Sequence, residues 1–300
     1  MGINKKEISN TTSDQEKFVL LHPRYSFDDI VLTHVVKEQL KDFISFYKNR
    51  GLLFNEWGLS KRYKDRNNLC LNFYGDSGSG KTMTAHALIN FLGKEVLQVN
   101  YADIESKYVG ETSKNLQELF RFASENGAVI LLDEADALLS RRVTDMSSAT
   151  DVSVNQTRSV LLTLLDMYDG IVIFTTNFIS NYDAAFMRRI QHHIHFELPN
   201  CEQREELWKF YLDTGVPHRV NMKELAEKYE GISGAYISYA VFQAAITTAR
   251  KAETVMSQDN LEHAVRQIME SKRAHDPQIK VTKREVPEEY VREQTGGKIQ

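Results

Sequence analysis

The chain has 300 residues, of which 42% are hydrophobic and 26% charged, and its formal net charge is -4. This length suggests about two domains with ordinary globular cores. The charge gives no indication of a nucleic-acid partner, so we do not expect nucleic acid as a ligand. No run approaches the ~18 apolar residues of a membrane helix. We therefore expect no membrane partner, and because Cys70 and Cys201 make no disulfide framework, we expect a cytoplasmic protein.

The N-terminal residues 1–24 are rich in Ser, Thr, Asn and Lys without periodicity, and we predict a flexible tail there. Apolar residues then recur from Val36 to Tyr47 at helical spacing, with Thr33 as the expected N-cap. Residues 50–68 mix glycines with polar and basic residues. We interpret them as a connection that leads into the next strand.

Short apolar runs alternate with helical patterns over residues 69–196. The predicted strands are residues 69–74, 96–99, 128–132, 171–175 and 194–196. The helices between them cover residues 83–92 and 113–125, and one ends near Tyr168. The run at 128–132 is continuously apolar, as expected of a parallel strand covered on both faces. We therefore predict an α/β fold with a parallel five-stranded sheet flanked by helices.

The pattern changes after Pro199, where only helical runs follow. Apolar residues recur at helical spacing in residues 207–212, 237–249 and 261–269. We therefore expect a large α/β domain at residues 25–199 and a small all-helical domain at residues 200–275. Residues 276–300 contain two prolines and many charges, which predicts a polar tail.

A phosphate-loop pattern follows the first predicted strand and precedes a predicted helix. It consists of Gly75, Asp76, Ser77, Gly78, Ser79, Gly80, Lys81 and Thr82, with Met83 next. Glycines let successive N–H groups point at a phosphate, and the helix adds its positive N-terminal end. Lys81 would reach the β- and γ-phosphates, and the Thr82 hydroxyl would ligate Mg²⁺. The alternative is a Gly/Ser loop that happens to end in Lys-Thr.

Two carboxylates end the third predicted strand, at the edge where parallel sheets hold their ligands. Asp133 would sit in the outer shell of Mg²⁺, and Glu134 would orient the water that attacks the γ-phosphate. Acidic residues at a helix N-terminus are the alternative interpretation. Asn177 ends the fourth strand, where its side chain would bond the γ-phosphate or the attacking water.

Together these motifs resemble the AAA ATPases, in particular the group of katanin, spastin, fidgetin and the ESCRT-disassembly ATPase. Residues 75–82 look like Walker A, residues 130–134 like Walker B, and Asn177 like sensor 1. The resemblance implies a P-loop NTPase sheet followed by a small helical lid domain, with ATP and Mg²⁺ as cofactors. It also implies a homo-oligomer, a hexameric ring that acts on a protein client.

Residues 183–189 resemble the family segment that carries arginine fingers. By this resemblance, Arg188 and Arg189 reach the γ-phosphate of a neighbouring subunit, where Arg neutralises the charge that develops during phosphoryl transfer. The alternative is a pair of surface arginines in a turn.

Residues 107–111 resemble the first pore loop of the family. Lys107, Tyr108 and Val109 would then face the channel and hold an extended polypeptide, because a rigid aromatic grips many side chains without reading sequence. Alternatively, Tyr108 packs under its own loop.

Two further segments resemble nucleotide contacts of the family. Asp29 and Ile30 look like the segment beside adenine, and Gly234 and Ala235 look like the small-domain motif that contacts nucleotide. Ala235 replaces the sensor 2 arginine of other AAA+ groups. Asp76-Ser77 departs from the usual Pro-Pro pair, and we expect no folded N-terminal adaptor domain.

Metal and protease chemistry receive little support from the sequence. His192, His193 and His195 lie on or beside a strand that sends alternate side chains to opposite faces, and no Cys or acidic cluster completes a metal shell. The His-Glu-x-x-His motif of the membrane-protease branch is absent.

The sequence thus favours ATP hydrolysis that drives remodelling, unfolding or disassembly of a protein client through a ring. An ATP-dependent switch or loader on nucleic acid is the alternative, which basic loops facing the channel would favour. A scaffold that binds ATP without turnover is a third interpretation, against which the intact Glu134 argues. The client and the biological process are not encoded in any motif that we identify.

Overall fold

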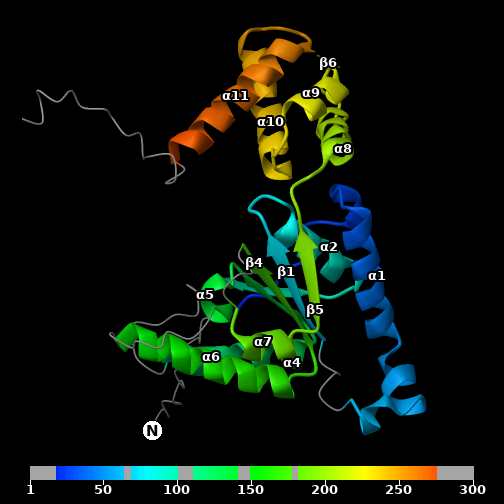
Figure 1. Cartoon of the computed structure of the whole chain (residues 1–300), viewed down its shortest axis with the longest axis vertical. Coiled ribbons are helices and arrows are strands. Elements are labelled where there is room, and N and C mark those ends of the chain that lie inside the picture. The colour runs from blue at the N-terminus through cyan, green and yellow to red at the C-terminus, as the bar shows by residue number, and fades with distance from the viewer. Residues whose placement is uncertain (1–17, 64–68, 101–110, 141–148, 178–181, 276–300) are drawn as a thin grey trace, which may run out of the picture. The chain divides into compact units, whose positions relative to one another are not determined.

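The structure is a computed structural model, and it describes residues 18–63, 69–100, 111–140, 149–177 and 182–275 (Figure 1). The chain divides into two compact units. The first comprises Met1–Leu207 and Tyr229–Ala235, and the second comprises Trp208–Lys228 and Tyr236–Gln300.

The first unit is built on a parallel sheet of five strands, in the order β2-β3-β4-β1-β5. The strands are β1 (Leu69–Gly75), β2 (Val96–Asn100), β3 (Val129–Asp133), β4 (Ile171–Thr176) and β5 (His192–Phe196). All five predicted strands are confirmed, because short apolar runs bounded by polar turns fit strands covered on both faces. The parallel register brings the carboxyl ends of β1, β3 and β4 to one edge of the sheet.

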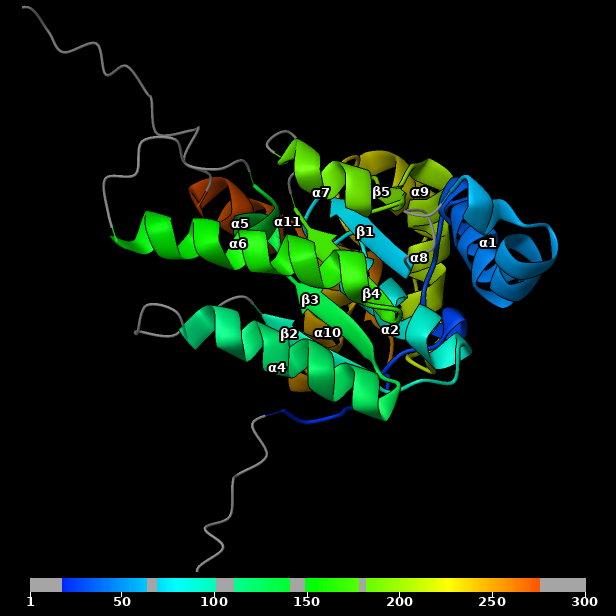
Figure 2. The same cartoon turned by 90° about the horizontal axis from the view of Figure 1, so that it is seen from below.

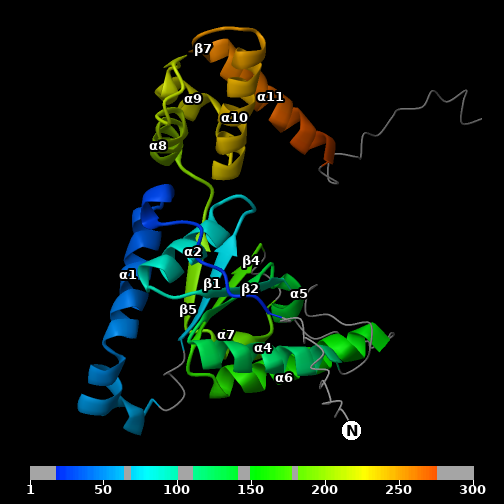
Figure 3. The same ribbon diagram turned by 180° about the vertical axis from the view of Figure 1, so that it is seen from behind.

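Helices cover both faces of this sheet. On one face, α1 (His34–Lys48) and α2 (Lys81–Phe91) pack on alternate strand residues such as Leu71 and Ile173 (Figure 3). On the other face, α4 (Glu111–Asn126) and α6 (Ala149–Met167) run side by side and cover residues such as Val172 (Figure 2). Successive side chains of a strand point to opposite faces of the sheet, so alternate residues contribute to the two cores. The position of a polar residue in its strand therefore determines the face on which it lies.

Helix α1 begins where the sequence predicts it. The Thr33 side chain accepts a hydrogen bond from the backbone N–H of Val36, and Val36, Leu40 and Phe43 form its buried stripe. Residues 50–61 are more structured than the predicted connection, because they include a π-helical turn, η2 (Leu52–Glu56), and a 3-10 turn, η3 (Leu59–Lys61).

The predicted N-terminal tail is too long at its C-terminal end. Leu21 forms an antiparallel bridge with Val96, with both N–H to O distances at 2.9 Å, and Phe18 and Leu20 pack against the core. Their short apolar run, Phe18 to Leu21, is the signal that the compositional argument overlooked. A 3-10 turn, η1 (Phe27–Asp29), follows.

Two short helices complete the described part of the first unit. They are α5 (Asp136–Leu139), directly after β3, and α7 (Ala184–Arg189), directly before β5. Asp183 caps α7 by accepting a hydrogen bond from the N–H of Ala185 at 2.9 Å.

The C-terminal region is helical, as predicted, with α8 (Cys201–Leu212), α9 (Met222–Lys228), α10 (Gly234–Arg250) and α11 (Gln258–His275). Its core in the second unit includes Trp208, Leu225 and Val265. A parallel pair of two-residue strands, β6 (His218–Arg219) and β7 (Met256–Ser257), was not predicted, because two residues are too few to show alternation. None of the described helices is both long and apolar enough to span a membrane.

Candidate functional site

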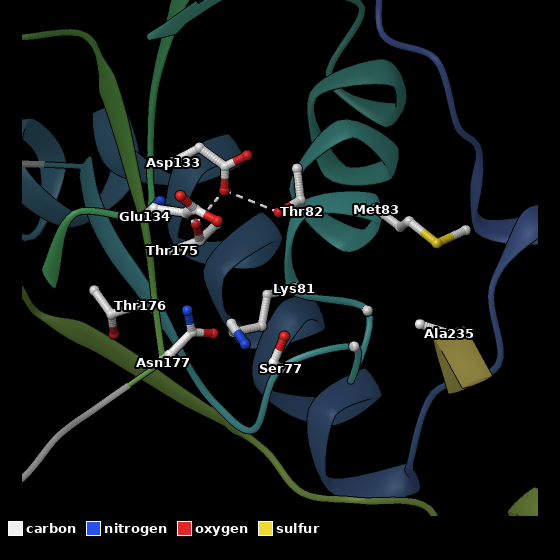
Figure 4. Close-up of a pocket in the computed structure, with 12 residues that line it drawn as sticks. Ser77, Lys81, Thr82, Met83, Asp133, Glu134, Thr175, Thr176, Asn177 and Ala235 are labelled. Carbon is white, nitrogen blue, oxygen red and sulfur yellow. Dashed lines mark hydrogen bonds between the residues drawn. The ribbon is translucent and has the colours of Figure 1, made fainter. Parts of the chain in front are cut away.

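A pocket opens at the carboxyl edge of the sheet, where the glycine-rich loop meets α2 and the ends of β3 and β4 (Figure 4). Its lining residues are Ser77, Gly78, Gly80, Lys81, Thr82, Met83, Asp133, Glu134, Thr175, Thr176, Asn177 and Ala235. All of them belong to the first unit. The pocket thus brings together ten of the residues that the sequence singles out for the site.

The loop conformation requires glycine at two positions. Gly75 has φ +136°, and an added Cβ would lie 2.0 Å from the carbonyl oxygen of Phe196. Gly78 has φ +75°, and an added Cβ would lie 2.8 Å from the Ser233 hydroxyl and 2.9 Å from the Ala235 Cβ. These close approaches leave space only for hydrogen, so the glycines shape the loop as well as permitting its turns.

The Lys81 ammonium lies at the start of α2, and the residue is only 7% exposed. It donates hydrogen bonds to the carbonyl oxygens of Gly75 at 2.7 Å and Asp76 at 2.8 Å. Burial lowers the pKa of Lys81, while the nearby carboxylates of Asp136, Asp76 and Asp133 act in the opposite direction. A buried cation on a loop of inward-facing backbone is suited to binding an anion.

Asp133 ends β3 and is held by hydroxyl groups from two elements. Its Oδ1 accepts from Thr82 Oγ1 on α2 at 2.9 Å and from Thr175 Oγ1 on β4 (Figure 4). Its other oxygen, Oδ2, accepts from Gln98 Nε2 on β2 at 3.1 Å. The contributions of Thr175 and Gln98 were not predicted, although a lone glutamine in the apolar run 96–99 was a visible signal.

Glu134 has φ +53°, in the left-handed region that non-glycine residues seldom adopt. Such a conformation costs about 1–3 kcal/mol and tends to occur where a site needs it. Its backbone N–H donates to Thr175 Oγ1 at 3.1 Å, which fixes the turn. Its side chain and that of Asn177 both line the pocket, and the Asn177 N–H donates to Asp136 Oδ1 at 3.0 Å.

The opposite end of the pocket is formed by Met83 and Ala235 (Figure 4). The Ala235 N–H donates to the Gly78 carbonyl oxygen at 3.2 Å, so residues 229–235 are tied to the loop by backbone. Gly234 does not itself line the pocket, but an added Cβ there would lie 3.7 Å from the same Gly78 oxygen.

Several predicted nucleotide contacts lie outside the pocket lining. Gly75 and Ser79 belong to the loop, and the buried Ser79 hydroxyl has no hydrogen-bond partner among the described residues. Asp29 Oδ2 accepts from the N–H and hydroxyl of Ser26, which lowers the pKa of Asp29. Ile30 packs against the core. A role for Asp29 and Ile30 beside adenine therefore stays a prediction.

The two predicted finger arginines have different surroundings on α7, and neither lines the pocket. Arg189 forms a two-pronged ion pair with Asp166 of α6, with both N to O distances at 2.7 Å. Arg188 is exposed, and its Nε donates to the carbonyl oxygen of Ala184 at 3.2 Å. The predicted pore-loop residues Lys107, Tyr108 and Val109 lie outside the described residues.

The three histidines of β5 have three different surroundings. His192 packs against Phe43 and Phe46, and His195 stacks on Tyr74 with 4.7 Å between ring centroids. The ring of His193 faces the buried Asn72 on the opposite side of the sheet from His192. His195 Nδ1 also lies 3.5 Å from Glu197 Oε1, but no group of three or more possible metal ligands forms among the described residues.

A strand, a glycine-rich loop, a helix N-terminus and carboxylates at the end of a nearby parallel strand define an α/β P-loop nucleoside triphosphatase module. The sequence model of the "ATPase family associated with various cellular activities (AAA)" matches residues 71–198. Residues 71–198 therefore form an AAA ATPase domain.

Curated relatives of the chain include an ATP-dependent zinc metalloprotease FtsH 2 from Thermoanaerobacter sp., 28% identical over 93% of this chain and 54% of that protein. A proteasome-activating nucleotidase from Methanopyrus kandleri is 31% identical over 69% of this chain and 49% of its own length. Cell division protein C from Sulfolobus acidocaldarius is 32% identical, over 76% and 61%. The chain thus spans about half the length of the curated relatives it matches.

Proposed function

We propose that this chain binds ATP with Mg²⁺, hydrolyses it in the pocket just described, and uses the energy to remodel a protein client. The observation that carries the proposal is the convergence of Lys81, Thr82, Asp133, Glu134 and Asn177 on one pocket at the carboxyl edge of a parallel sheet. This donor and acceptor set suits phosphoryl transfer, in which catalysis rests on positioning and on charge stabilisation.

The residues present fit both ATP and Mg²⁺. The loop backbone, the Lys81 ammonium and the unpartnered Ser79 hydroxyl are donors for phosphate oxygens. The Thr82 hydroxyl is a hard oxygen ligand of the type that Mg²⁺ prefers, and the Asp133 carboxylate, whose Oδ1 accepts from it at 2.9 Å, would lie in the outer shell of the ion. When bound, Mg²⁺ neutralises charge on the β- and γ-phosphates. The adenine end would lie toward Met83 and Ala235.

Glu134 is our candidate for orienting the attacking water. Its carboxylate lies at the pocket next to Asp133, and its turn is held by the hydrogen bond to Thr175. A carboxylate in this place accepts a hydrogen bond from water and polarises it toward the γ-phosphate. Asn177, on the neighbouring strand, would contact the γ-phosphate or the same water.

Oligomerisation is part of the proposal because the arginines of α7 do not line the pocket of their own chain. Arg188 is exposed and suited to reaching a neighbouring subunit, whereas the ion pair with Asp166 commits Arg189 to its own chain. An arginine acting in trans is worth ~10³–10⁵ in rate in other phosphoryl-transfer enzymes. We therefore favour a homo-oligomeric ring, a hexamer by the family resemblance, and propose Arg188 as its main finger.

A protein client is favoured by the names of the relatives and by the net charge. Two relatives are a proteasome-activating nucleotidase and a metalloprotease, whose names point to protein substrates. The charge of -4 gives no support to the alternative, a loader on nucleic acid. The absence of His-Glu-x-x-His from this chain leaves no basis for zinc protease activity here.

Finer assignments belong to the same proposal. The proposed membership in the katanin, spastin and fidgetin group rests on the sequence motifs alone. The same is true of the proposed role of Lys107, Tyr108 and Val109 in gripping the client. We also propose a cytoplasmic location, a large domain that ends near residue 199 and a small domain over residues 200–275. The second unit would act as the lid of the module.

The decisive experiment is a capture of the client with Glu134→Gln. This variant should bind ATP, lose most turnover and hold its client, because the water is no longer polarised while the phosphate contacts remain. Pull-downs with ATP are compared with Lys81→Ala by mass spectrometry and tested for nucleic acid. A protein enriched only with Glu134→Gln supports remodelling, and nucleic acid without protein supports the loader. Unchanged turnover in Glu134→Gln would reject the assigned role.

A further inference from the structure

A chain of hydrogen bonds leads from the N-terminal segment to Asp133 through two residues outside the pocket. The Arg24 N–H donates to His86 Nδ1 at 3.4 Å, His86 Nε2 lies 3.1 Å from Gln98 Oε1, and Gln98 Nε2 donates to Asp133 Oδ2 at 3.1 Å. With His86 neutral and its proton on Nε2, each group donates in the same direction. Such chains of aligned bonds strengthen one another.

The secondary structure explains why these side chains meet. In the parallel register Asn100 pairs with Asp133, so Gln98, two residues earlier on β2, projects from the same face as Asp133. His86 lies four residues after Thr82 on α2, which places both on one side of the helix. Helix α2 is therefore linked to Asp133 in two ways. Thr82 contacts Asp133 directly, and His86 is linked to it through Gln98.

The N-terminal segment closes the far end of this chain. His86 is 2% exposed, and the ring of Tyr25 packs edge-on against it, with 6.1 Å between centroids. The segment is anchored by the bridge between Leu21 and Val96, which lies two residues before Gln98 on β2. Burial lowers the pKa of His86, in agreement with the neutral ring that this bonding pattern needs.

We propose that Gln98 and His86 are positioning residues that hold the Asp133 carboxylate in the orientation required for Mg²⁺, with the docked segment Leu21–Tyr25 as their anchor. Asp133 Oδ1 is held by two hydroxyls, and Gln98 supplies the donor to Oδ2, so loss of Gln98 frees the carboxylate to rotate. The inference rests on the proposed function, because it concerns the same Mg²⁺ site. Groups that orient a metal-site carboxylate in this way typically change metal affinity by about 10- to 100-fold when removed.

The test measures binding of a fluorescent, non-hydrolysable ATP analogue to the full chain, with Mg²⁺ and with EDTA. Gln98→Leu should weaken binding with Mg²⁺ by about 10-fold or more and leave binding in EDTA within about twofold of the unsubstituted protein. His86→Phe, which keeps an aromatic ring against Tyr25, should weaken Mg²⁺-dependent binding in the same direction. The double variant should bind no more weakly than Gln98→Leu alone, because both residues act through one contact.

Equal losses with Mg²⁺ and EDTA, no loss in either, or additive effects of the two substitutions would overturn the inference. Thermal melts identify any variant that fails to fold, and Gln98→Met, of similar length and without a donor, then replaces Gln98→Leu with the same expectation. Lys81→Ala separates the two proposals. If Lys81→Ala still binds the analogue fully, the proposed ATP site fails, whereas a null result for Gln98 beside a loss in Lys81→Ala rejects only the positioning role.

Discussion

At the scale of single residues, two adjacent arginines on α7 differ in their contacts and therefore in their expected roles. Arg189 donates two hydrogen bonds to Asp166, and its side chain is 30% exposed. Arg188 makes one local bond to Ala184 and points outward from a short, capped helix. The sequence presents them as equivalent, because nothing in Arg-Arg tells which of the two meets an acid twenty-three residues earlier.

Arg188→Ala should therefore leave ATP binding and folding intact while reducing turnover, by about 10³-fold if it serves as a finger in trans. A mixing experiment checks this: Arg188→Ala protein, with an intact Glu134, is combined with Glu134→Gln protein, with an intact Arg188. The mixture should regain ATPase activity that neither variant has alone. Two inactive proteins that stay inactive together would argue against a shared site.

Arg189→Ala should act on stability instead. The ion pair with Asp166 is partly exposed, so we expect its loss to lower the free energy of unfolding by up to about 1 kcal/mol. Urea unfolding of Arg189→Ala beside Arg188→Ala measures the difference. A larger loss of stability in Arg188→Ala than in Arg189→Ala would contradict the assignment.

At the scale of elements, a cluster of buried polar side chains joins β1 and β4 to the segment before α7, beside the site. Asn72 in the middle of β1 is fully buried, and its Nδ2 donates to the hydroxyl of Tyr182 at 3.0 Å. That hydroxyl also bonds Thr176 at the end of β4, and burial raises the pKa of Tyr182, so it stays protonated. The group links the end of the strand that carries Asn177 to the segment that leads into α7.

Tyr182→Phe should destabilise the protein by about 1–3 kcal/mol, because it leaves the Asn72 amide buried without this acceptor. Tyr74→Phe, on the same strand as Asn72, is the matched control. Its ring stacks on His195, and loss of its hydroxyl should change stability by less than about 0.5 kcal/mol. Chemical denaturation of both variants measures the change in the free energy of unfolding. Equal changes would mean that the Tyr182 hydroxyl contributes no more to stability than the Tyr74 hydroxyl.

Local sequence patterns predicted the strands and the phosphate loop, whereas contacts between neighbouring strands were missed. Apolar runs predicted all five strands, and the phosphate-loop pattern predicted Lys81 and Thr82 at the pocket, since both signals are local. Thr175 and Gln98 were missed because their roles depend on strand order and register, which bring β2 and β4 beside β3. A hydrophobic pattern specifies a strand but not its neighbours.

At the scale of the whole molecule, the first unit includes a segment that composition assigned to a tail. Residues 18–25 contribute apolar contacts to the core, a backbone pair with β2 and the ring that covers His86. The polar residues around this segment hid it, since a run of four apolar residues gives little periodicity. Its inclusion extends the fold N-terminally beyond the predicted limit at residue 25.

Two truncations test this extension. Compared with a protein that lacks residues 1–17, a protein that lacks residues 1–24 should have a free energy of unfolding lower by about 2 kcal/mol or more through lost apolar burial. Thermal and urea unfolding of both proteins provide the measurement. If both truncations unfold like the full chain, residues 18–24 contribute nothing to the core.

The left-handed backbone of Glu134 has a consequence for how this domain can evolve. An L-residue at φ +53° stores strain that glycine would relieve, yet glycine has no carboxylate to act on water. At position 134, the residue that permits hydrolysis therefore lowers the stability of the fold. A lineage that no longer needed turnover would become more stable by replacing the acid. An inactive descendant with glycine at this position would be a more heat-resistant nucleotide binder than its active parent.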